Sequence, residues 1–107
     1  MKKYEIKKMV RGWFVGNFEP TAFETKDCEV ACQNYKAGDC EKRHVHKIAT
    51  ELTLIIKGKA IMNGQEFNEG EIIVIDPEEA TDFKAVTDVT NVVVKVPCVK
   101  EDKYLVE

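Results

Sequence analysis

The sequence lacks the features that direct a chain into a membrane or out of the cell. No run approaches the roughly 18 apolar residues of a membrane span. The first eight residues carry lysines but no apolar segment of the kind found in signal peptides. The four cysteines, in a chain without a secretion signal, do not argue for a disulfide framework. We therefore expect a cytoplasmic protein with no membrane contact.

An excess of charge of one sign is also lacking. The 16 basic residues face 19 acidic ones, which gives a formal charge of -3, and both signs are spread along the chain. A nucleic-acid partner would require a basic stripe, so we expect none. No repeat or low-complexity linker divides the 107 residues, a length typical of one domain. We expect a single domain over residues 1–107 with its core in about 25–97.

Helical periodicity is absent as well, whereas turn signals separate many short apolar stretches. The Asn63-Gly64 pair is the strongest of these signals and predicts a two-residue hairpin with a type I′ turn. Residues 11–18 form a further strand candidate, and a polar tail follows Pro97. The chain should therefore be all-β, with strands at 28–35, 51–57, 59–62, 65–67, 71–75, 81–86 and 89–96.

Both histidines of the protein lie in the stretch between Gly38 and Gly58. In an extended strand His44 and His46 point to the same side, with Cα atoms about 6.6 Å apart. Glu51 begins the next apolar run, so a tight turn through residues 47–50 would bring its carboxylate back beside them. Two imidazoles and one carboxylate form the facial triad that binds Fe(II) and related metals.

The wider spacing of this stretch is specific. Gly38, His44, His46, Glu51 and Gly58 match the first motif of the cupin superfamily at every offset. The sequence therefore resembles a cupin, which implies a single-domain β-barrel or double-stranded jelly roll. The resemblance also implies a divalent transition metal (Fe, Mn, Zn or Ni) held by the two histidines and the glutamate.

The second cupin motif is degenerate in this chain. Counted from Gly70, its proline is shifted to Pro77, Thr81 stands at the histidine position and Ala85 at the asparagine position. Phe83 lies two residues after Thr81, where many cupins carry an aromatic residue, and supports this alignment. The fourth ligand of the family is thus missing. A metal here would have three protein ligands and an extra open position, or the barrel would hold no metal.

The strand at residues 51–57 has two largely apolar faces. Alternation places Glu51, Thr53 and Ile55 on one face and the intervening leucines and isoleucine on the other. A strand of this kind is covered on both sides. In a small barrel one side is the interior and the other needs a second layer or a subunit, so we expect a homodimer.

Three functions fit these expectations. In the first, a metal held by His44, His46 and Glu51 acts on a small oxygen-rich metabolite in an isomerisation, epimerisation or oxygenation. Neighbouring strands would supply the ligand pocket, with the candidates Thr81, Gln33, Thr53 and Trp13.

The second function is metal-free. The run Arg43 to Lys47, R-H-V-H-K, also resembles the nucleotide-sugar isomerase branch of cupin-like proteins, in which a histidine pair serves as acid and base. The third function is a non-catalytic barrel that binds a small ligand.

Overall fold

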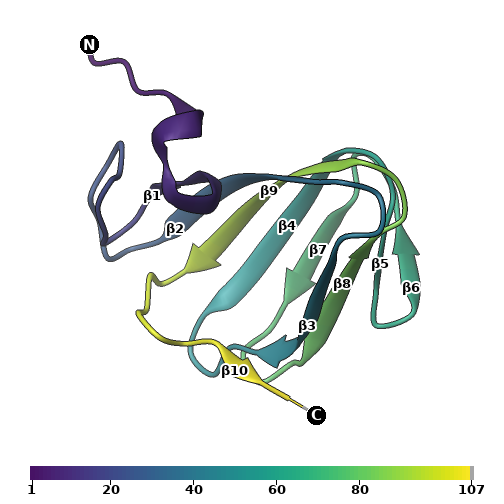
Figure 1. The fold of residues 1–107 in the computed structure, drawn as a ribbon. Coiled ribbons are helices and arrows are strands. Elements are labelled where there is room, and N and C mark those ends of the chain that lie inside the picture. The colour runs from purple at the N-terminus through teal and green to yellow at the C-terminus, as the bar shows by residue number, and fades with distance from the viewer. Residues whose placement is uncertain (107) are drawn as a thin grey trace.

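The computed structural model describes residues 1–106 and consists of two antiparallel sheets of five strands each (Figure 1). Sheet A has the order β1-β2-β9-β4-β7 and sheet B the order β10-β3-β8-β5-β6. The bounds in sheet A are β1 Trp13–Val15, β2 Glu29–Tyr35, β4 Thr50–Lys57, β7 Ile72–Ile75 and β9 Val89–Val96. Those in sheet B are β3 Cys40–Val45, β5 Ala60–Met62, β6 Gln65–Phe67, β8 Thr81–Ala85 and β10 Tyr104–Leu105.

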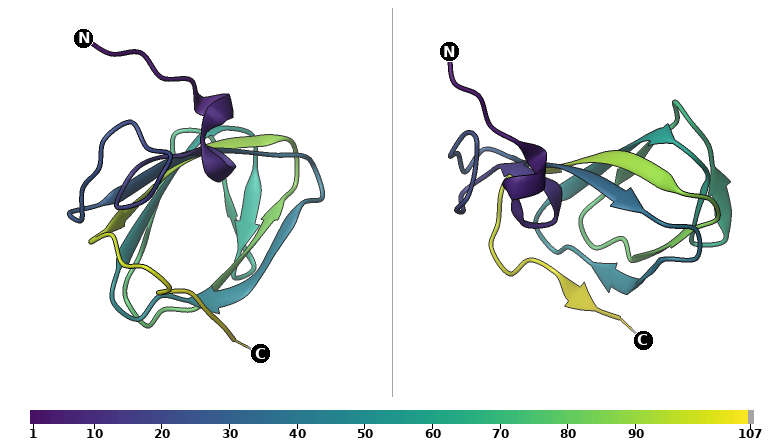
Figure 2. Two further views of the ribbon diagram at one scale, coloured as in Figure 1. Left: turned by 60° about the vertical axis from the view of Figure 1, so that its left-hand side comes forward. Right: turned by 45° about the horizontal axis from the view of Figure 1, so that its top comes forward.

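The chain passes repeatedly from one sheet to the other between β2 and β9, so the two sheets wrap into a jelly-roll barrel (Figures 1 and 2). This confirms the predicted all-β fold. The Asn63-Gly64 hairpin is also confirmed, because Met62 pairs with Gln65 and both turn residues have positive φ, 51° and 75°. No helix within residues 1–106 has the length and apolar character needed to cross a membrane. The cytoplasmic location stays a prediction.

The N-terminal region differs from its prediction. Two short 3₁₀ turns, Ile6–Lys8 and Val10–Gly12, replace the first part of the strand expected at 11–18. Arg11 and Gly12 both have positive φ, 51° and 79°, which bends the backbone before β1 can begin. The strand is therefore only three residues long.

The residues after Pro97 do not form a free tail. They return along the barrel as β10, where Tyr104 pairs with Val45 and Leu105 with His44 (Figure 1). The Lys47 ammonium lies 4.2 Å from the centre of the Tyr104 ring, a cation–π contact. The C-terminal segment thus becomes the edge strand of sheet B beside the histidine strand.

The inward side chains of sheet A change character along the barrel. Strand pairing puts Glu29, Lys95 and Glu51 in one cross-strand row, and Gln33, Asn91 and Ile55 in a row four residues further along. The buried apolar cluster extends from Ile75, which pairs with Glu51, toward that second end and consists of Ile55, Ala60, Met62, Ile75, Phe83, Ala85 and Val89. One end of the barrel is therefore packed, while the other is polar.

The outward face of sheet A is apolar and lacks a cover from the described residues. Ile72 is 64 % exposed and Val74 is 54 % exposed, beside the outward residues of β4 and β9. We call this surface the outer patch, formed by Leu52, Leu54, Ile56, Ile72, Val74, Val92, Val94 and Val96. The two-faced pattern of β4 therefore corresponds to one inward face and one apolar outward face that belongs to the outer patch.

Candidate metal centre

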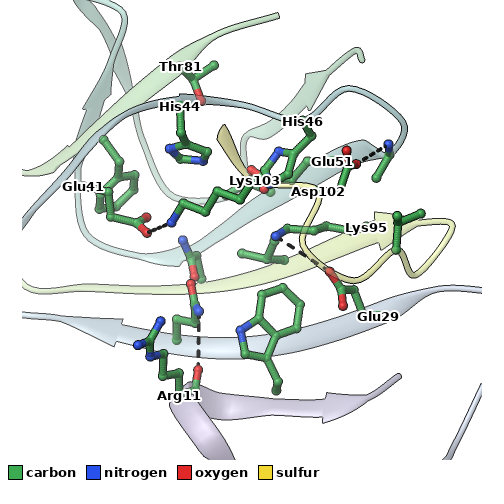
Figure 3. Close-up of a pocket in the computed structure, with 18 of the residues that line it drawn as sticks. Arg11, Glu29, Glu41, His44, His46, Glu51, Thr81, Lys95, Asp102 and Lys103 are labelled. Atoms are coloured by element: carbon green, nitrogen blue, oxygen red, sulfur yellow. Dashed lines mark hydrogen bonds and ion pairs between the residues drawn. The ribbon is translucent and has the colours of Figure 1, made fainter. Parts of the chain in front are cut away.

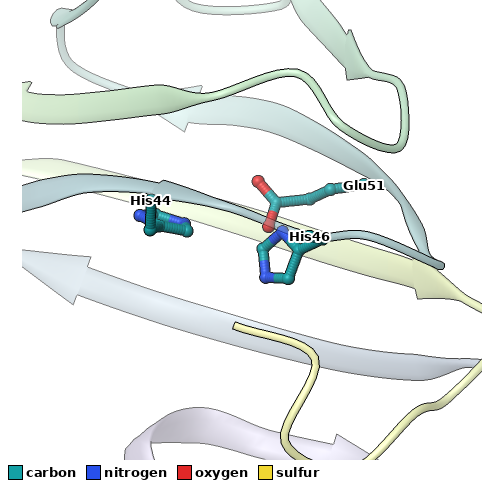
Figure 4. Close-up of side chains that lie close together, drawn as sticks. All are labelled: His44, His46 and Glu51. Atoms are coloured by element: carbon teal, nitrogen blue, oxygen red, sulfur yellow. The ribbon is translucent and has the colours of Figure 1, made fainter. Parts of the chain in front are cut away.

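Three potential metal ligands meet at the connection between β3 and β4. His44 is near the end of β3, His46 follows it, and Glu51 is the second residue of β4. Their side-chain ligand atoms all lie within 4.8 Å of one another (Figure 4). The structure thus brings together the three residues that the sequence spacing selected.

The imidazole of His44 has a defined orientation. Its Nδ1 lies 2.9 Å from the backbone carbonyl oxygen of Lys42. A carbonyl oxygen only accepts hydrogen bonds, so Nδ1 carries a proton, and in the neutral ring Nε2 then carries the lone pair. Metal-binding histidines commonly make this bond, because it fixes the ring and leaves the other nitrogen free to coordinate.

His46 contains a buried nitrogen without a partner. The residue is 5 % exposed, and its Nε2 makes no hydrogen bond. Burial, together with the positive charge of Lys95, lowers its pKa to about 4. The ring is therefore neutral at neutral pH, the form that binds metals. An unpaired buried nitrogen is costly, and a bound cation would satisfy it.

Glu51 is the third member of the group and is 9 % exposed. Burial raises the pKa of its carboxyl group, and the nearby Lys95 and His44 oppose that shift. The Thr53 hydroxyl donates a long hydrogen bond of 3.4 Å to Glu51 Oε2. A divalent cation would stabilise the ionised carboxylate, so the donor set of two neutral imidazoles and one carboxylate fits such a metal.

A cavity of about 440 Å³ opens beside these ligands, inside the polar end of the barrel (Figure 3). All four pocket candidates from the sequence line it: Trp13, Gln33, Thr53 and Thr81. Thr81 is the cross-strand partner of His44. Trp13 and Gln33 lie across the cavity on sheet A, while Thr53 contacts Glu51.

Sequence reasoning missed an ion pair on the cavity wall. Lys95 Nζ lies 3.7 Å from Glu29 Oε1, and both side chains are largely buried. The same ammonium lies 5.0 Å from the centre of the Trp13 ring. The sequence did contain a signal for this ion pair. Lys95 follows Val89, Asn91 and Val93 on the inward face of a largely apolar strand.

Sequence reasoning selected only Gln33 from a group that is rich in hydrogen-bond acceptors. The Tyr35 hydroxyl lies 2.7 Å from Gln33 Oε1 and 3.0 Å from Glu41 Oε2, but has one proton to donate. Burial and the neighbouring Glu41 raise the Tyr35 pKa well above its usual value, so the proton stays on the oxygen. Asn91, which is 2 % exposed, adds a buried carbonyl oxygen without a partner. We call these four residues the acceptor wall.

Comparison with known proteins gives structural matches only. No family model matches the sequence, and no curated protein matches it. Several solved structures share the fold.

A conserved protein with a double-stranded β-helix domain from Klebsiella pneumoniae is 22% identical to this chain, with a TM-score of 0.71. The match covers 78% of this chain and 73% of the Klebsiella protein. An RmlC-like cupin from Shewanella frigidimarina is 15% identical, with a TM-score of 0.65, and the match covers 73% of this chain and 72% of that cupin. The DMSP lyase DddQ from Ruegeria pomeroyi is 15% identical with a TM-score of 0.72; the match covers 87% of this chain but 49% of the lyase.

Proposed function

We propose that this chain, which has the double-stranded β-helix fold of cupin-type proteins, holds a divalent transition metal between His44, His46 and Glu51. The observation that carries the proposal is the buried, unpartnered His46 Nε2 beside a second oriented imidazole and a buried carboxylate. When bound, such a metal supplies Lewis-acid chemistry to an oxygen ligand in its open coordination positions. Fe, Mn, Zn and Ni all accept this donor set.

The ligand that we propose is a small oxygen-rich metabolite. Hydroxyl groups are hydrogen-bond donors, and the acceptor wall offers Asn91 Oδ1, which has no donor, and two oxygens that share the single Tyr35 proton. The cavity of about 440 Å³ lies within the usual range for small-molecule sites. A ligand of the size of a monosaccharide or a short hydroxy acid would reach both the metal ligands and this wall.

The residues of this chain suit an isomerase, epimerase or oxygenase type of reaction. The Tyr35 hydroxyl donates its one proton within the acceptor wall, so its oxygen would accept a hydrogen bond from a ligand hydroxyl and orient it. Thr81 lies next to His44 and would contact the part of the ligand nearest the metal. The apolar ring of Trp13 closes the opposite side of the cavity and would exclude water there.

The metal-free alternative receives less support. A nucleotide sugar carries a diphosphate, which the basic residues around the histidines would have to bind. Lys42, Arg43 and Lys47 are all exposed, and none of them lines the cavity. The four basic residues that do line it lie among seven acidic ones. Arg43 instead donates a hydrogen bond to the Asn63 side chain. A non-catalytic barrel would use the same metal and ligand site and differ only in the absence of turnover.

The first test of the proposed function is the metal content of the protein purified without chelator or affinity metal. We expect close to one metal per chain, measured by elemental analysis. If no metal is present, even after loading with Fe(II), Mn(II) and Zn(II), the metal proposal is wrong and the metal-free reading takes its place.

Replacing Thr81 by histidine should tighten metal binding, because it restores the fourth ligand of the family pattern, a third imidazole, beside His44. We expect at least about a tenfold lower dissociation constant for Co(II), since one extra ligand contributes more than the roughly 1.4 kcal/mol that corresponds to tenfold. Thr81→Val, which keeps the shape, is the matched control and should leave the constant unchanged. No difference between the histidine and valine variants would show that position 81 does not face the metal.

We also propose that the outer patch is covered by a second copy of this chain. The patch is apolar over three adjacent strands, and a two-fold interface needs only one self-complementary surface. Exposed apolar patches of this extent mark interaction sites in soluble proteins.

Val74→Lys tests this proposal, since Val74 is exposed in the patch and the change does not disturb the core. We expect the protein to have the mass of two chains in light scattering, and the variant to have the mass of one. Val86→Lys, at an exposed valine outside the patch, should remain a dimer. A wild-type monomer would contradict the proposal.

A further inference from the structure

The connection between β3 and β4 is held by a residue from the far end of the chain. Asp102 Oδ1 accepts hydrogen bonds from the backbone N–H groups of Lys47 and Ile48, at 3.0 and 3.2 Å. Asp102 Oδ2 accepts from Ile48 and Ala49, at 3.2 and 2.9 Å. One carboxylate therefore satisfies three consecutive backbone donors.

This carboxylate is buried, since Asp102 is 5 % exposed. A buried charge is costly unless hydrogen bonds compensate it, and here the three N–H groups of the turn do so. The turn N–H groups need the carboxylate equally, because Asp102 is the hydrogen-bond partner of all three. The turn and the C-terminal segment therefore depend on each other for these hydrogen bonds.

The clasped turn separates two of the candidate metal ligands. His46 immediately precedes Lys47, and Glu51 follows Ala49 by two residues. Figure 3 shows Asp102 beside both of them. The positions of the His46 ring and the Glu51 carboxylate relative to each other thus depend on the conformation of residues 47–49.

We propose that Asp102 is a positioning residue for the candidate metal centre, which it preorganises by fixing the turn between His46 and Glu51. This inference rests on the proposed metal site. It also makes the C-terminal segment part of that site, although the segment contributes no ligand. Supporting residues that orient metal ligands commonly contribute tenfold to a hundredfold to metal affinity.

Further contacts hold the C-terminal segment against the barrel. The stretch from Val99 to Lys103 lines the cavity. Its last residue also contacts β3, because Lys103 Nζ lies 3.8 Å from Glu41 Oε1. The pairing of β10 with β3 continues beyond Leu105, because the Val106 N–H donates to the Arg43 carbonyl oxygen at 3.0 Å. Asp102 is the point at which this segment is joined to the ligand-bearing turn.

The test compares Co(II) affinity in the full chain and in variants of this residue. Asp102→Asn keeps the side-chain shape but presents an NH₂ group to backbone donors, so at least one hydrogen bond is lost. We expect a tenfold to hundredfold higher Co(II) dissociation constant for Asp102→Asn, and a larger increase for Asp102→Ala.

The matched control is Asp88→Ala. Asp88 Oδ1 also accepts a backbone hydrogen bond, from Ala37 at 2.9 Å, but the residue does not line the cavity. A purely structural aspartate would lower the midpoint of urea unfolding and leave the Co(II) constant unchanged, which is the behaviour we expect of Asp88→Ala. The same behaviour in Asp102→Asn would overturn the inference.

A second measurement keeps the inference testable without metal. Long-range proton–nitrogen NMR spectra of the metal-free protein report the environment of the His46 ring. We expect Asp102→Asn to shift these ring resonances, whereas Asp88→Ala should not. If wild type binds no metal but the shift occurs, the proposed function fails and the positioning role stands. If wild type binds metal and neither the constant nor the ring resonances change, the positioning role fails alone.

Discussion

Replacing His46 by glutamine is expected to raise the dissociation constant for Zn(II) or Co(II) by about a hundredfold or more. Structural zinc sites gain about 10–16 kcal/mol from four ligands, so one ligand contributes on the order of 3 kcal/mol, or about a hundredfold. Glutamine has nearly the size of histidine but offers only a weakly coordinating amide. Titration of the metal-free protein against a chelating indicator measures the change.

Val86→Gln is the control for this variant, because it introduces the same residue at an exposed position that does not line the cavity. Its metal affinity should equal that of wild type, and circular dichroism should show the same strand content for both variants. Combining His44→Ala with His46→Ala should abolish binding. A double variant that retains one metal per chain would show that the site lies elsewhere.

Replacing Gly58 by alanine is expected to lower the free energy of unfolding by about 4 kcal/mol. The glycine has a φ of 93°, which costs other residues about 1–2 kcal/mol. A Cβ at this position would lie 2.1 Å from the backbone oxygen of Asp88 and 2.8 Å from Thr87 Oγ1. Because backbone atoms cannot rotate away, the strand ends must shift, and overpacking of this kind costs about 1–3 kcal/mol more.

Gly38→Ala provides the control within the same motif. Its φ of 94° is almost the same, but a Cβ there would have no neighbour within 4 Å. We expect it to lose only the conformational cost of about 1–2 kcal/mol. Urea unfolding of both variants measures the difference, and an equal loss would show that the contact with Asp88 does not matter. The two motif glycines are thus required for different reasons.

The fold could be predicted because its signals are local. The Asn63-Gly64 turn and the apolar alternation of β4 and β9 each lie within a few residues, and the structure bears them out. The prediction for residues 11–18 was wrong in extent, because no local pattern indicated that Arg11 would adopt a positive φ. The polar character of the C-terminal segment concealed its role as an edge strand.

The candidate site could be predicted where its residues are close in the sequence. His44, His46 and Glu51 are separated by one short turn, so strand geometry alone could bring them together. Asp102 is joined to the same turn across more than fifty residues, and Tyr35 meets Glu41 from another sheet. Contacts of this kind depend on the closed barrel, and no periodicity or spacing in one sequence indicates them.

The division of the barrel into a packed end and a polar end has a consequence for redesign. Ile55 belongs to the buried apolar cluster, whereas Gln33 and Asn91 in the same cross-strand row line the cavity. Substitutions at these two polar positions exchange hydrogen-bonding groups without removing apolar contacts from the cluster. Ligand preference can therefore be altered at one end of the barrel while the other end preserves the fold, which gives this small scaffold unusual latitude for laboratory evolution.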